Sequence, residues 1–355
     1  MSELEIICER EGFCGIVTLN RPEALNALTL NMVRQMAAAL DQWENDTRVR
    51  CIAVRGSGNK AFCAGGDIRI LYYLGRAGRH AEQLSFWREE YQLNRRIKHY
   101  PKPYVALVGG IVMGGGAGLS LLGSYVIAGE RFSFAMPEAS IGFFPDVGAT
   151  YFLPRLPSRA GVYLALTAGR MTCGDALSFG VARAHIPSAR HAGLTQRLIG
   201  GEEIESAIAA ERAPPPASAL LPQSELMERC FSAATLPAIL ANLDEAGDAG
   251  SSFARSAAEA IRSKSPSSLA IALRQMQIGG KLDIDEALRT EFRIVSRIAR
   301  SHDFYEGVRA VIIDKDNRPH WNPATIDRVD STMVDSYFAP LHEGELNVRK
   351  QVCSP

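Results

Sequence analysis

Two glycine-rich turns in this chain can offer bare backbone N–H groups to a ligand. They lie at residues 64–67 (AGGD) and 114–116 (GGG), and each follows a β-rich stretch and precedes a helical one. Two such donors aimed at one carbonyl oxygen form an oxyanion hole, which stabilises the charge that appears as the carbonyl becomes tetrahedral or enolate-like. Glycine permits the close approach because it has no Cβ. Either turn alone is more typical of an ordinary strand-to-helix connection, so the pair carries the prediction.

Two carboxylates lie in the apolar, proline-punctuated stretch 133–157. They are Glu138 and Asp146. A carboxyl group is rarely buried without a reason, and burial raises its pKa into the range that suits general acid–base or nucleophilic work. The alternative is that each acid caps a helix or a turn, for which Asp146, directly after a proline, is a fair candidate.

A third acid, Glu90, lies on a helix that the pattern predicts over residues 81–98. It shares a face with Phe86, Leu93 and Ile97, whereas its neighbour Glu89 falls on another face. Glu90 is therefore expected to point toward the core. There it would either contact a substrate or form an ordinary buried ion pair.

Other kinds of active site find less support in the sequence. The seven histidines show no metal-ligand spacing, no serine lies in a GxSxG motif, and neither glycine turn matches GxGxxG. Cys63 adjoins the first turn, but no histidine is near it in sequence, so it is interpreted as a small packing residue. No metal and no separate cofactor are expected.

Composition places the chain among ordinary globular proteins. It has 355 residues, of which 46% are hydrophobic and 22% charged, and 39 basic residues balance 39 acidic ones. A balanced charge does not favour binding to nucleic acid or to a membrane surface. The uncharged run 104–129 exceeds the length of a membrane helix, but its many glycines indicate buried strands and turns instead.

The cysteines and the N-terminus bear on location. The seven cysteines form no CxxC pair and are interpreted as reduced thiols. The first residues, MSELEIICEREG, show neither an apolar signal core nor an Arg- and Ser-rich transit pattern. A cytoplasmic location is therefore expected.

The order of elements predicts an α/β fold. Strands at 15–20, 51–56 and 104–110 alternate with helices near 29–43 and 81–98, which is typical of parallel β/α packing with a site at the carboxyl ends of the strands. Residues 201–222, rich in Ala, Pro and Glu, are predicted to be a connecting segment. The rest of the chain, 223–355, is predicted to be helical.

The motifs together resemble the crotonase (enoyl-CoA hydratase/isomerase) superfamily. The resemblance lies in LNRPEALNAL (19–28), KAFCAGGDIR (60–69), KPYVALVGGIVMGGGAGL (102–119) and MPEASIGFFPDVGATYFLPRL (136–156). Within it, the chain is most similar to the 3-hydroxyisobutyryl-CoA hydrolases, through FWREEYQLN (86–94), SPSSLAIALRQM (265–276) and SHDFYEGVRAVIIDKDNRPHW (301–321). The implied fold is a crotonase-like ββα spiral core over residues 1–200, followed by an α-helical C-terminal region.

The resemblance also implies a role for each matching position. The catalytic set is Glu138 and Asp146, with the backbone N–H groups of Gly66 and Gly115 as the oxyanion hole. The segments that line the substrate and its CoA are represented by Glu90, Ala64, Gly65, Asp67, Ile68, Glu23, Ala24 and Leu25. Coenzyme A is thus part of the substrate. The implied reaction is hydrolysis of a short 3-hydroxyacyl-CoA, such as 3-hydroxyisobutyryl-CoA in valine breakdown.

One departure separates the chain from typical hydratases. Those enzymes usually carry a second catalytic glutamate two residues after the glycine triplet, where this chain has Gly118, while Asp146 stands where hydratases commonly have glycine. Hydrolysis is therefore favoured over enoyl-CoA hydration or isomerisation. A non-catalytic acyl-CoA-binding protein is the alternative from another class. Homo-oligomers, trimers or hexamers, are common among crotonase relatives and are expected here unless the C-terminal region covers that surface.

Overall fold

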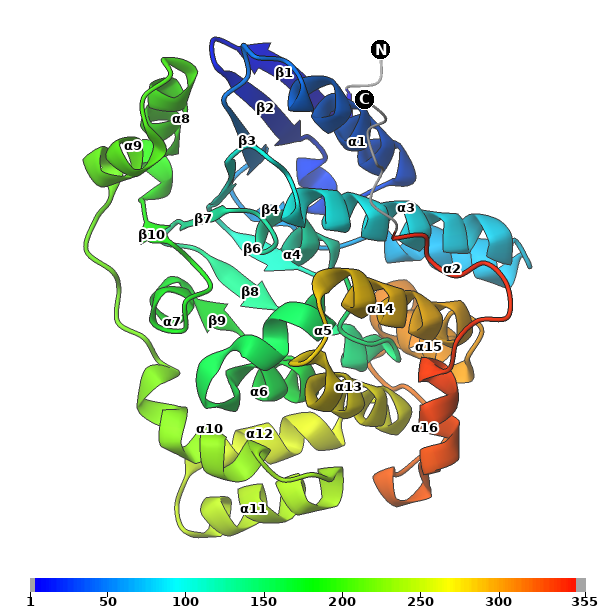
Figure 1. The fold of residues 1–355 in the computed structure, drawn as a ribbon. Helices are drawn as coiled ribbons and strands as arrows, with labels where there is room; N and C mark the ends of the chain where they lie inside the picture. The colour runs from blue at the N-terminus through cyan, green and yellow to red at the C-terminus, as the bar shows by residue number, and fades with distance from the viewer. Residues whose placement is uncertain (1–3, 349–355) are drawn as a thin grey trace.

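The computed structural model describes residues 4–348, and two β-sheets form the centre of the fold (Figure 1). The six-stranded sheet has the order β1-β2-β3-β5-β7-β10, and the four-stranded sheet has the order β4-β6-β8-β9. The strands are β1 (Ile6–Glu11), β2 (Cys14–Leu19), β3 (Cys51–Gly56), β4 (Ala61–Cys63), β5 (Tyr104–Val108), β6 (Ile111–Met113), β7 (Tyr125–Ala128), β8 (Ser133–Ala135), β9 (Met171–Thr172) and β10 (Ala184–His185).

Most strand pairs are parallel, as the alternation of elements predicts. Only β1 with β2 and β8 with β9 run antiparallel among the described strands. The β1–β2 pair was not expected. The chain turns back from β1 into β2 through Gly12, which has a positive φ. The strands β2 and β5 are buried at every position, which explains their continuous apolar runs.

The helices of the first 200 residues surround these sheets. They are α1 (Leu30–Glu44), α2 (Ile68–Arg76), α3 (His80–Lys98), α4 (Gly115–Ser120), α5 (Ala149–Phe152), α6 (Ala160–Thr167), α7 (Cys173–Ser178) and α8 (His191–Ile199). The start of α1 follows from its sequence, since the Thr29 hydroxyl accepts a hydrogen bond from the Met32 amide at 3.2 Å. The apolar face of α1 is buried as the helical spacing predicts.

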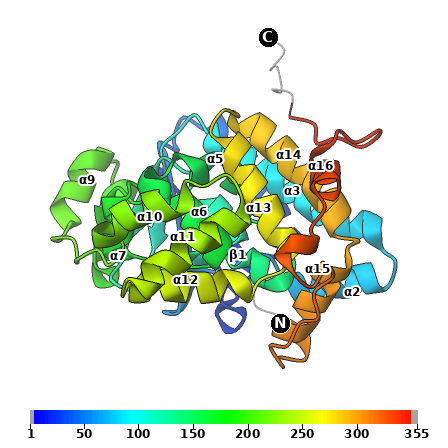
Figure 2. The ribbon, with the colours of Figure 1, turned by 90° about the horizontal axis from the view of Figure 1, so that it is seen from below.

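The C-terminal half is helical, as predicted. Its helices are α10 (Ser224–Phe231), α11 (Leu236–Asp248), α12 (Ser252–Arg262), α13 (Pro266–Gly279), α14 (Ile284–Ile298), α15 (His302–Val308) and α16 (Ser331–Phe338). Seen from below, α10, α11 and α12 lie together beside α6 (Figure 2). Helix α14 packs against α3, and apolar residues of both halves form one continuous core.

Two local differences from the sequence expectations have clear physical reasons. The segment 201–222 is not wholly a connection, because α9 (Ile204–Glu211) buries Ile204, Ala207 and Ile208 against the six-stranded sheet's outer core. The helical region predicted from residue 223 begins with two separate helices, α10 and α11, since Thr235 caps a new helix that has proline in its first turn.

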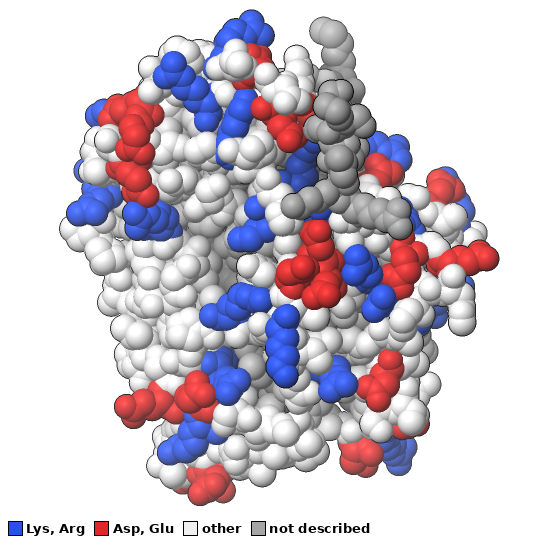
Figure 3. Space-filling view, in the orientation of Figure 1, with Lys and Arg blue, Asp and Glu red and all other residues white. Residues whose placement is uncertain are grey.

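The surface carries charges of both signs on the face shown in Figure 3. Within residues 4–348, no helix is long and apolar enough to cross a membrane. The uncharged run 104–129 instead forms β5, β6, α4 and β7, which are almost entirely buried.

Candidate active site

Three neighbouring parallel strands of the four-stranded sheet end at the candidate site. The strand β4 leads into turn 64–67, β6 leads into turn 114–116, and β8 leads toward Glu138. Because β4 pairs with β6 and β6 pairs with β8, the carboxyl ends of all three meet at one edge. The predicted site therefore forms at the carboxyl ends of strands, as the sequence analysis expected.

The two glycine turns lie against each other. A Cβ built on Gly65 would stand 3.7 Å from the Gly115 amide nitrogen, and one built on Gly115 would stand 3.3 Å from the Gly66 amide nitrogen. Gly65 and Gly114 have φ values of +111° and +45°, which favour glycine. The Gly66 and Gly115 amides donate no hydrogen bond to any group in residues 4–348. Both N–H groups thus remain available for one oxygen atom.

Glu138 comes to this pair of turns from the third strand. It begins a short 3-10 helix, Glu138–Ile141, and its Oε1 lies 3.2 Å from the place where a Cβ on Gly114 would be. The side chain is buried, and its Oε2 has no hydrogen-bond partner within the described chain. Burial, followed by the negative charge of Asp146, raises the Glu138 pKa well above its ordinary value. A buried carboxyl group whose pKa is raised in this way holds a proton more readily, which suits general acid–base work.

Asp146 lies in a tight turn after Pro145, and its charge acts on both Glu138 and Glu90. Tyr91 on α3 donates a hydrogen bond of 2.8 Å from its hydroxyl to Asp146 Oδ2. Burial raises the Asp146 pKa to about 7, while the Tyr91 hydroxyl opposes that rise by stabilising the carboxylate. The two following residues, Val147 and Gly148, have φ values of +54° and +93°. A branched side chain rarely adopts such a φ, so the turn is strained.

Glu90 points into the core, as its helical spacing predicts, and reaches the second glycine turn. A Cβ built on Gly115 would collide with Glu90 Oε1, and this oxygen has no hydrogen-bond partner within residues 4–348. Burial and the charges of Asp146 and Glu291 raise the Glu90 pKa well above its ordinary value. Its neighbour Glu89 instead makes a two-point ion pair with Arg34 at 2.7 Å. The buried-ion-pair alternative for Glu90 therefore finds no partner here.

A fourth buried acid, Glu291 on α14, was missed in the sequence. Its carboxylate accepts two backbone hydrogen bonds of 2.8 Å, from the amides of Gly148 and Thr150. Burial raises its pKa to about 8 even though both amides lower it. Glu291 lies on the helical face of Leu288 and Val295, so the spacing rule that found Glu90 would also have found it.

The C-terminal half also contacts the backbone next to both candidate catalytic acids, Glu138 and Asp146. Gln275 on α13 donates through Nε2 to the Pro145 carbonyl at 2.8 Å. The Ser265 amide donates to the Ala139 carbonyl at 3.2 Å. The 3-10 helix of Glu138 and the turn of Asp146 are thus each fixed from the C-terminal side.

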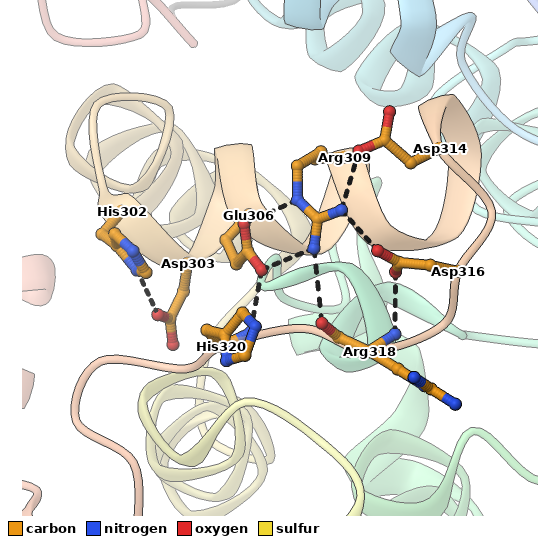
Figure 4. Close-up of polar contacts among 8 residues, drawn as sticks. All are labelled: His302, Asp303, Glu306, Arg309, Asp314, Asp316, Arg318 and His320. Atoms are coloured by element: carbon orange, nitrogen blue, oxygen red, sulfur yellow. Dashed lines mark hydrogen bonds and ion pairs between the residues drawn. The ribbon is translucent and has the colours of Figure 1, made fainter.

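The segment 301–321, which supported the resemblance, forms helix α15 and a cluster of ion pairs around Arg309 just after it (Figure 4). Arg309 pairs with Glu306 at 2.8 Å and with Asp314 and Asp316 at 2.7 Å. Helix α15 presses its Gly307 onto Ile141, where a Cβ would not fit. Helix α15 thus packs closely on the 3-10 helix that begins with Glu138, while the ion pairs of Arg309 fix the segment that follows α15.

The two segments predicted to line CoA lie side by side. The Ala64 amide donates to the Leu25 carbonyl at 3.0 Å, and the Leu28 amide donates to the Gly65 carbonyl at 2.8 Å. Asp67 caps α2, which starts at Ile68, and pairs with Arg21 at 3.1 Å. Its carboxylate is thus engaged in the protein, so backbone atoms are what Asp67 can offer to a substrate. The binding roles of Glu23, Ala24, Leu25 and residues 64–68 stay predictions.

Cys63 behaves as a packing residue. It is fully buried, and burial raises its pKa to about 12, which keeps the thiol protonated and unreactive. The six described cysteines are unpaired, and Cys353 lies outside the described residues. Within 4–348, no three His, Cys, Asp or Glu side chains gather as metal ligands would.

Known proteins are similar to this chain over nearly its whole length. The profile of the enoyl-CoA hydratase/isomerase family matches residues 14–338. The mitochondrial 3-hydroxyisobutyryl-CoA hydrolase of Danio rerio is 42% identical over 97% of this chain and 92% of its own length. The Homo sapiens protein of the same name is 42% identical over 96% and 90%.

Two solved structures share the fold closely. A protein called a carnitinyl-CoA dehydratase from Mycobacterium thermoresistibile superposes with a TM-score of 0.92 at 38% identity, over 98% of this chain and 99% of that one. A protein called an enoyl-CoA hydratase from Rhodobacter sphaeroides superposes with a TM-score of 0.89 at 40% identity, over 95% and 98%. The resemblance and the fold class predicted from sequence are confirmed: this chain belongs to the enoyl-CoA hydratase/isomerase family.

Proposed function

We propose that this protein hydrolyses short 3-hydroxyacyl-CoA thioesters, with 3-hydroxyisobutyryl-CoA as substrate and 3-hydroxyisobutyrate and CoA as products. Relatives at about two-fifths identity over nearly the full length carry this activity in their names. The observation that carries the proposal is the meeting of two free amides, at Gly66 and Gly115, with Glu138 and Asp146. Such a reaction is one step of valine breakdown.

The chemistry follows from where charge develops. The Gly66 and Gly115 amides would bind the thioester oxygen and stabilise the negative charge that it gains when the carbonyl carbon becomes tetrahedral. Glu138 would supply the attack, either with its own carboxylate or by taking a proton from water. Collapse then breaks the C–S bond and releases the CoA thiolate. On the water route the thiolate takes the proton that Glu138 removed from water. On the carboxylate route the acyl group stays on Glu138 as an anhydride, which a water molecule cleaves to the free acid while one of its protons goes to the thiolate. Asp146 would orient the water or the substrate hydroxyl.

The surroundings of Gly118 argue against hydration of a double bond. A Cβ built there would stand 2.5 Å from Asn94 Nδ2 and 2.8 Å from Val147 Cβ. A glutamate, the second acid of typical hydratases, would not fit without repacking. The acid pair available to this chain is Glu138 with Asp146. This pair favours hydrolysis over the dehydratase and hydratase activities in the names of the two solved structures.

A two-substrate assay tests the proposal. The purified protein is given 3-hydroxyisobutyryl-CoA and crotonyl-CoA, while free thiol and the enoyl absorbance are followed. We expect thiol release from the first thioester and little change in the second. Loss of enoyl absorbance from crotonyl-CoA without thiol release from either would replace hydrolysis by hydration.

Two further expectations stay predictions. The cytoplasmic location can be tested by cell fractionation, and relatives from animals carry the word mitochondrial in their names. Homo-oligomerisation can be tested by light scattering of the purified chain. Trimer or hexamer masses would support the crotonase precedent.

A further inference from the structure

Asn94 is a buried polar residue beside the site with neither end of its amide satisfied. Its side chain has no solvent exposure, and neither Nδ2 nor Oδ1 has a hydrogen-bond partner in residues 4–348. An amide left in this state costs free energy on folding, which natural proteins rarely tolerate without a use for the group. The mechanism above assigns it none.

The neighbours of Asn94 place this amide among the walls of the site. It follows Glu90 by one turn of α3, so the two side chains share a face. Its amide lies over Gly118 and beside Val147, the residue next to Asp146. Gly118 lies three residues after Gly115 on α4, about 4.5 Å along the helix axis.

This spacing fits a particular part of the substrate. If the thioester oxygen is held at the Gly115 amide and the acyl chain runs toward Gly118, the Asn94 amide lies beside atoms of that chain beyond the carbonyl carbon. The hydroxyl of a 3-hydroxyacyl group is carried two carbon atoms beyond that carbon. With glycine at 118, the Asn94 amide occupies the space that a side chain at this position would take, since a Cβ there would stand 2.5 Å from Asn94 Nδ2.

We propose that the Asn94 carboxamide binds the 3-hydroxyl group of the substrate and makes the enzyme prefer hydroxylated over plain acyl thioesters. The inference rests on the proposed hydrolysis and adds its specificity-determining residue. A carboxamide offers a donor at Nδ2 and an acceptor at Oδ1, so it can pair with a hydroxyl in both of that group's roles. A substrate without the hydroxyl would leave the buried amide unpaired, which disfavours its binding.

The test compares Asn94→Leu with the wild type on 3-hydroxyisobutyryl-CoA and isobutyryl-CoA, which differ only in the hydroxyl. Leucine has a similar volume but no hydrogen-bonding group. We expect kcat/KM to fall about 10- to 100-fold on the hydroxylated thioester and to change less than about 3-fold on isobutyryl-CoA. The melting temperature should hold or rise, since an unpartnered buried amide is removed.

The control is Gln92→Leu, an exposed position on the same helix, which should leave both rates unchanged. Equal losses on both thioesters would overturn the proposal, because Asn94 would then act on the carbonyl or on water. No loss on either would overturn it as well. If Asn94→Leu does not fold, Asn94→Ala carries the same comparison.

Failure of the proposed function gives a different result. If the wild type releases no thiol from either thioester, hydrolysis is wrong, and the role of Asn94 is then judged by calorimetric binding. Wild type should bind 3-hydroxyisobutyryl-CoA more tightly than isobutyryl-CoA, and Asn94→Leu should lose that preference. The same preference in both proteins would overturn the role of Asn94.

Discussion

The two halves of this molecule contribute different things to one site. The first 150 residues supply the groups proposed to touch the reacting atoms, namely Gly66, Gly115, Glu138 and Asp146. The C-terminal helices supply Glu291, Gln275 and Ser265, which bind backbone amides and carbonyls next to those groups. Substitutions in the two halves should therefore reduce activity in different ways.

The difference shows what the second half is for. The Asp146 turn contains two consecutive positive φ values, a backbone that persists only when its surroundings fix it. Glu291 provides that restraint by accepting hydrogen bonds from the Gly148 and Thr150 amides, although burial of its carboxylate is itself unfavourable. The C-terminal region thus restrains the strained turn of Asp146, a residue proposed to act on the substrate.

The largest effect is expected in the first half, from Glu138→Gln. It removes the group that attacks or takes the proton, so kcat should fall by about 10³-fold. Binding of the thioester should be kept, because the amides and the CoA segments are unchanged. Stopped assays of thiol release measure kcat, and calorimetry measures binding of the thioester. The exposed Glu225→Gln is the control. Unchanged turnover would favour the non-catalytic binding protein.

The next effect is expected in the second half, from Glu291→Gln. An amide can accept from only one of the Gly148 and Thr150 N–H groups with the same geometry, so the turn shifts. A shift of about 1 Å at a catalytic group costs up to about 100-fold in rate. We expect kcat to fall 10- to 100-fold with a smaller change in KM, about 3-fold or less.

The exposed Glu286→Gln on the same helix is the matched control and should leave kcat unchanged. The pH dependence of kcat/KM gives a readout that mere loss of stability would not move. A lower melting temperature with an unaltered kcat and pH profile would contradict the positioning role of Glu291.

A smaller effect, a shift in pH dependence, is expected from Tyr91→Phe. The Tyr91 hydroxyl stabilises the Asp146 carboxylate, whose pKa is about 7. Its loss removes a bond that favours the charged form, so the Asp146 pKa rises further. The rising limb of kcat/KM should move to higher pH by about one unit. Tyr73→Phe, at an exposed position, should cause no shift. A shift to lower pH would contradict this account.

The smallest effect concerns stability, from Glu90→Gln. The folded-state pKa of Glu90 is raised above its unfolded value, so the folded chain holds a proton that the unfolded chain releases as pH rises. This group therefore destabilises the fold increasingly above its ordinary pKa. The melting temperature of the variant relative to wild type should be higher at pH 8 than at pH 5. A difference that stays constant between these pH values would refute the raised pKa.

Much of the site followed from local patterns. The Thr29 cap, the two glycine turns and the inward face of Glu90 depend on spacing within one element, and the sequence displays such spacing directly. The burial of Glu138 and Asp146 also follows from their apolar stretch. These predictions needed no knowledge of how distant segments meet.

The rest depended on long-range packing. Nothing local indicates that β4, β6 and β8 leave the main sheet to form a second one, because strand partners are chosen by contacts across the chain. Asn94 and Glu291 could be predicted to be buried from their helical faces. Two facts could not be predicted without knowing how α14 and α4 pack against α3. They are which backbone amides Glu291 binds and that Asn94 lies over Gly118.

The central claim is that one thioester carbonyl is held by two amides while two acids reach its carbon. A crystal structure of Glu138→Gln with 3-hydroxyisobutyryl-CoA bound tests it most directly. The account predicts the thioester oxygen about 3 Å from both amide nitrogens, of Gly66 and Gly115, with the side chains at 138 and 146 beside the carbonyl carbon. An oxygen that touches neither amide, or acids that face separate cavities, would contradict it.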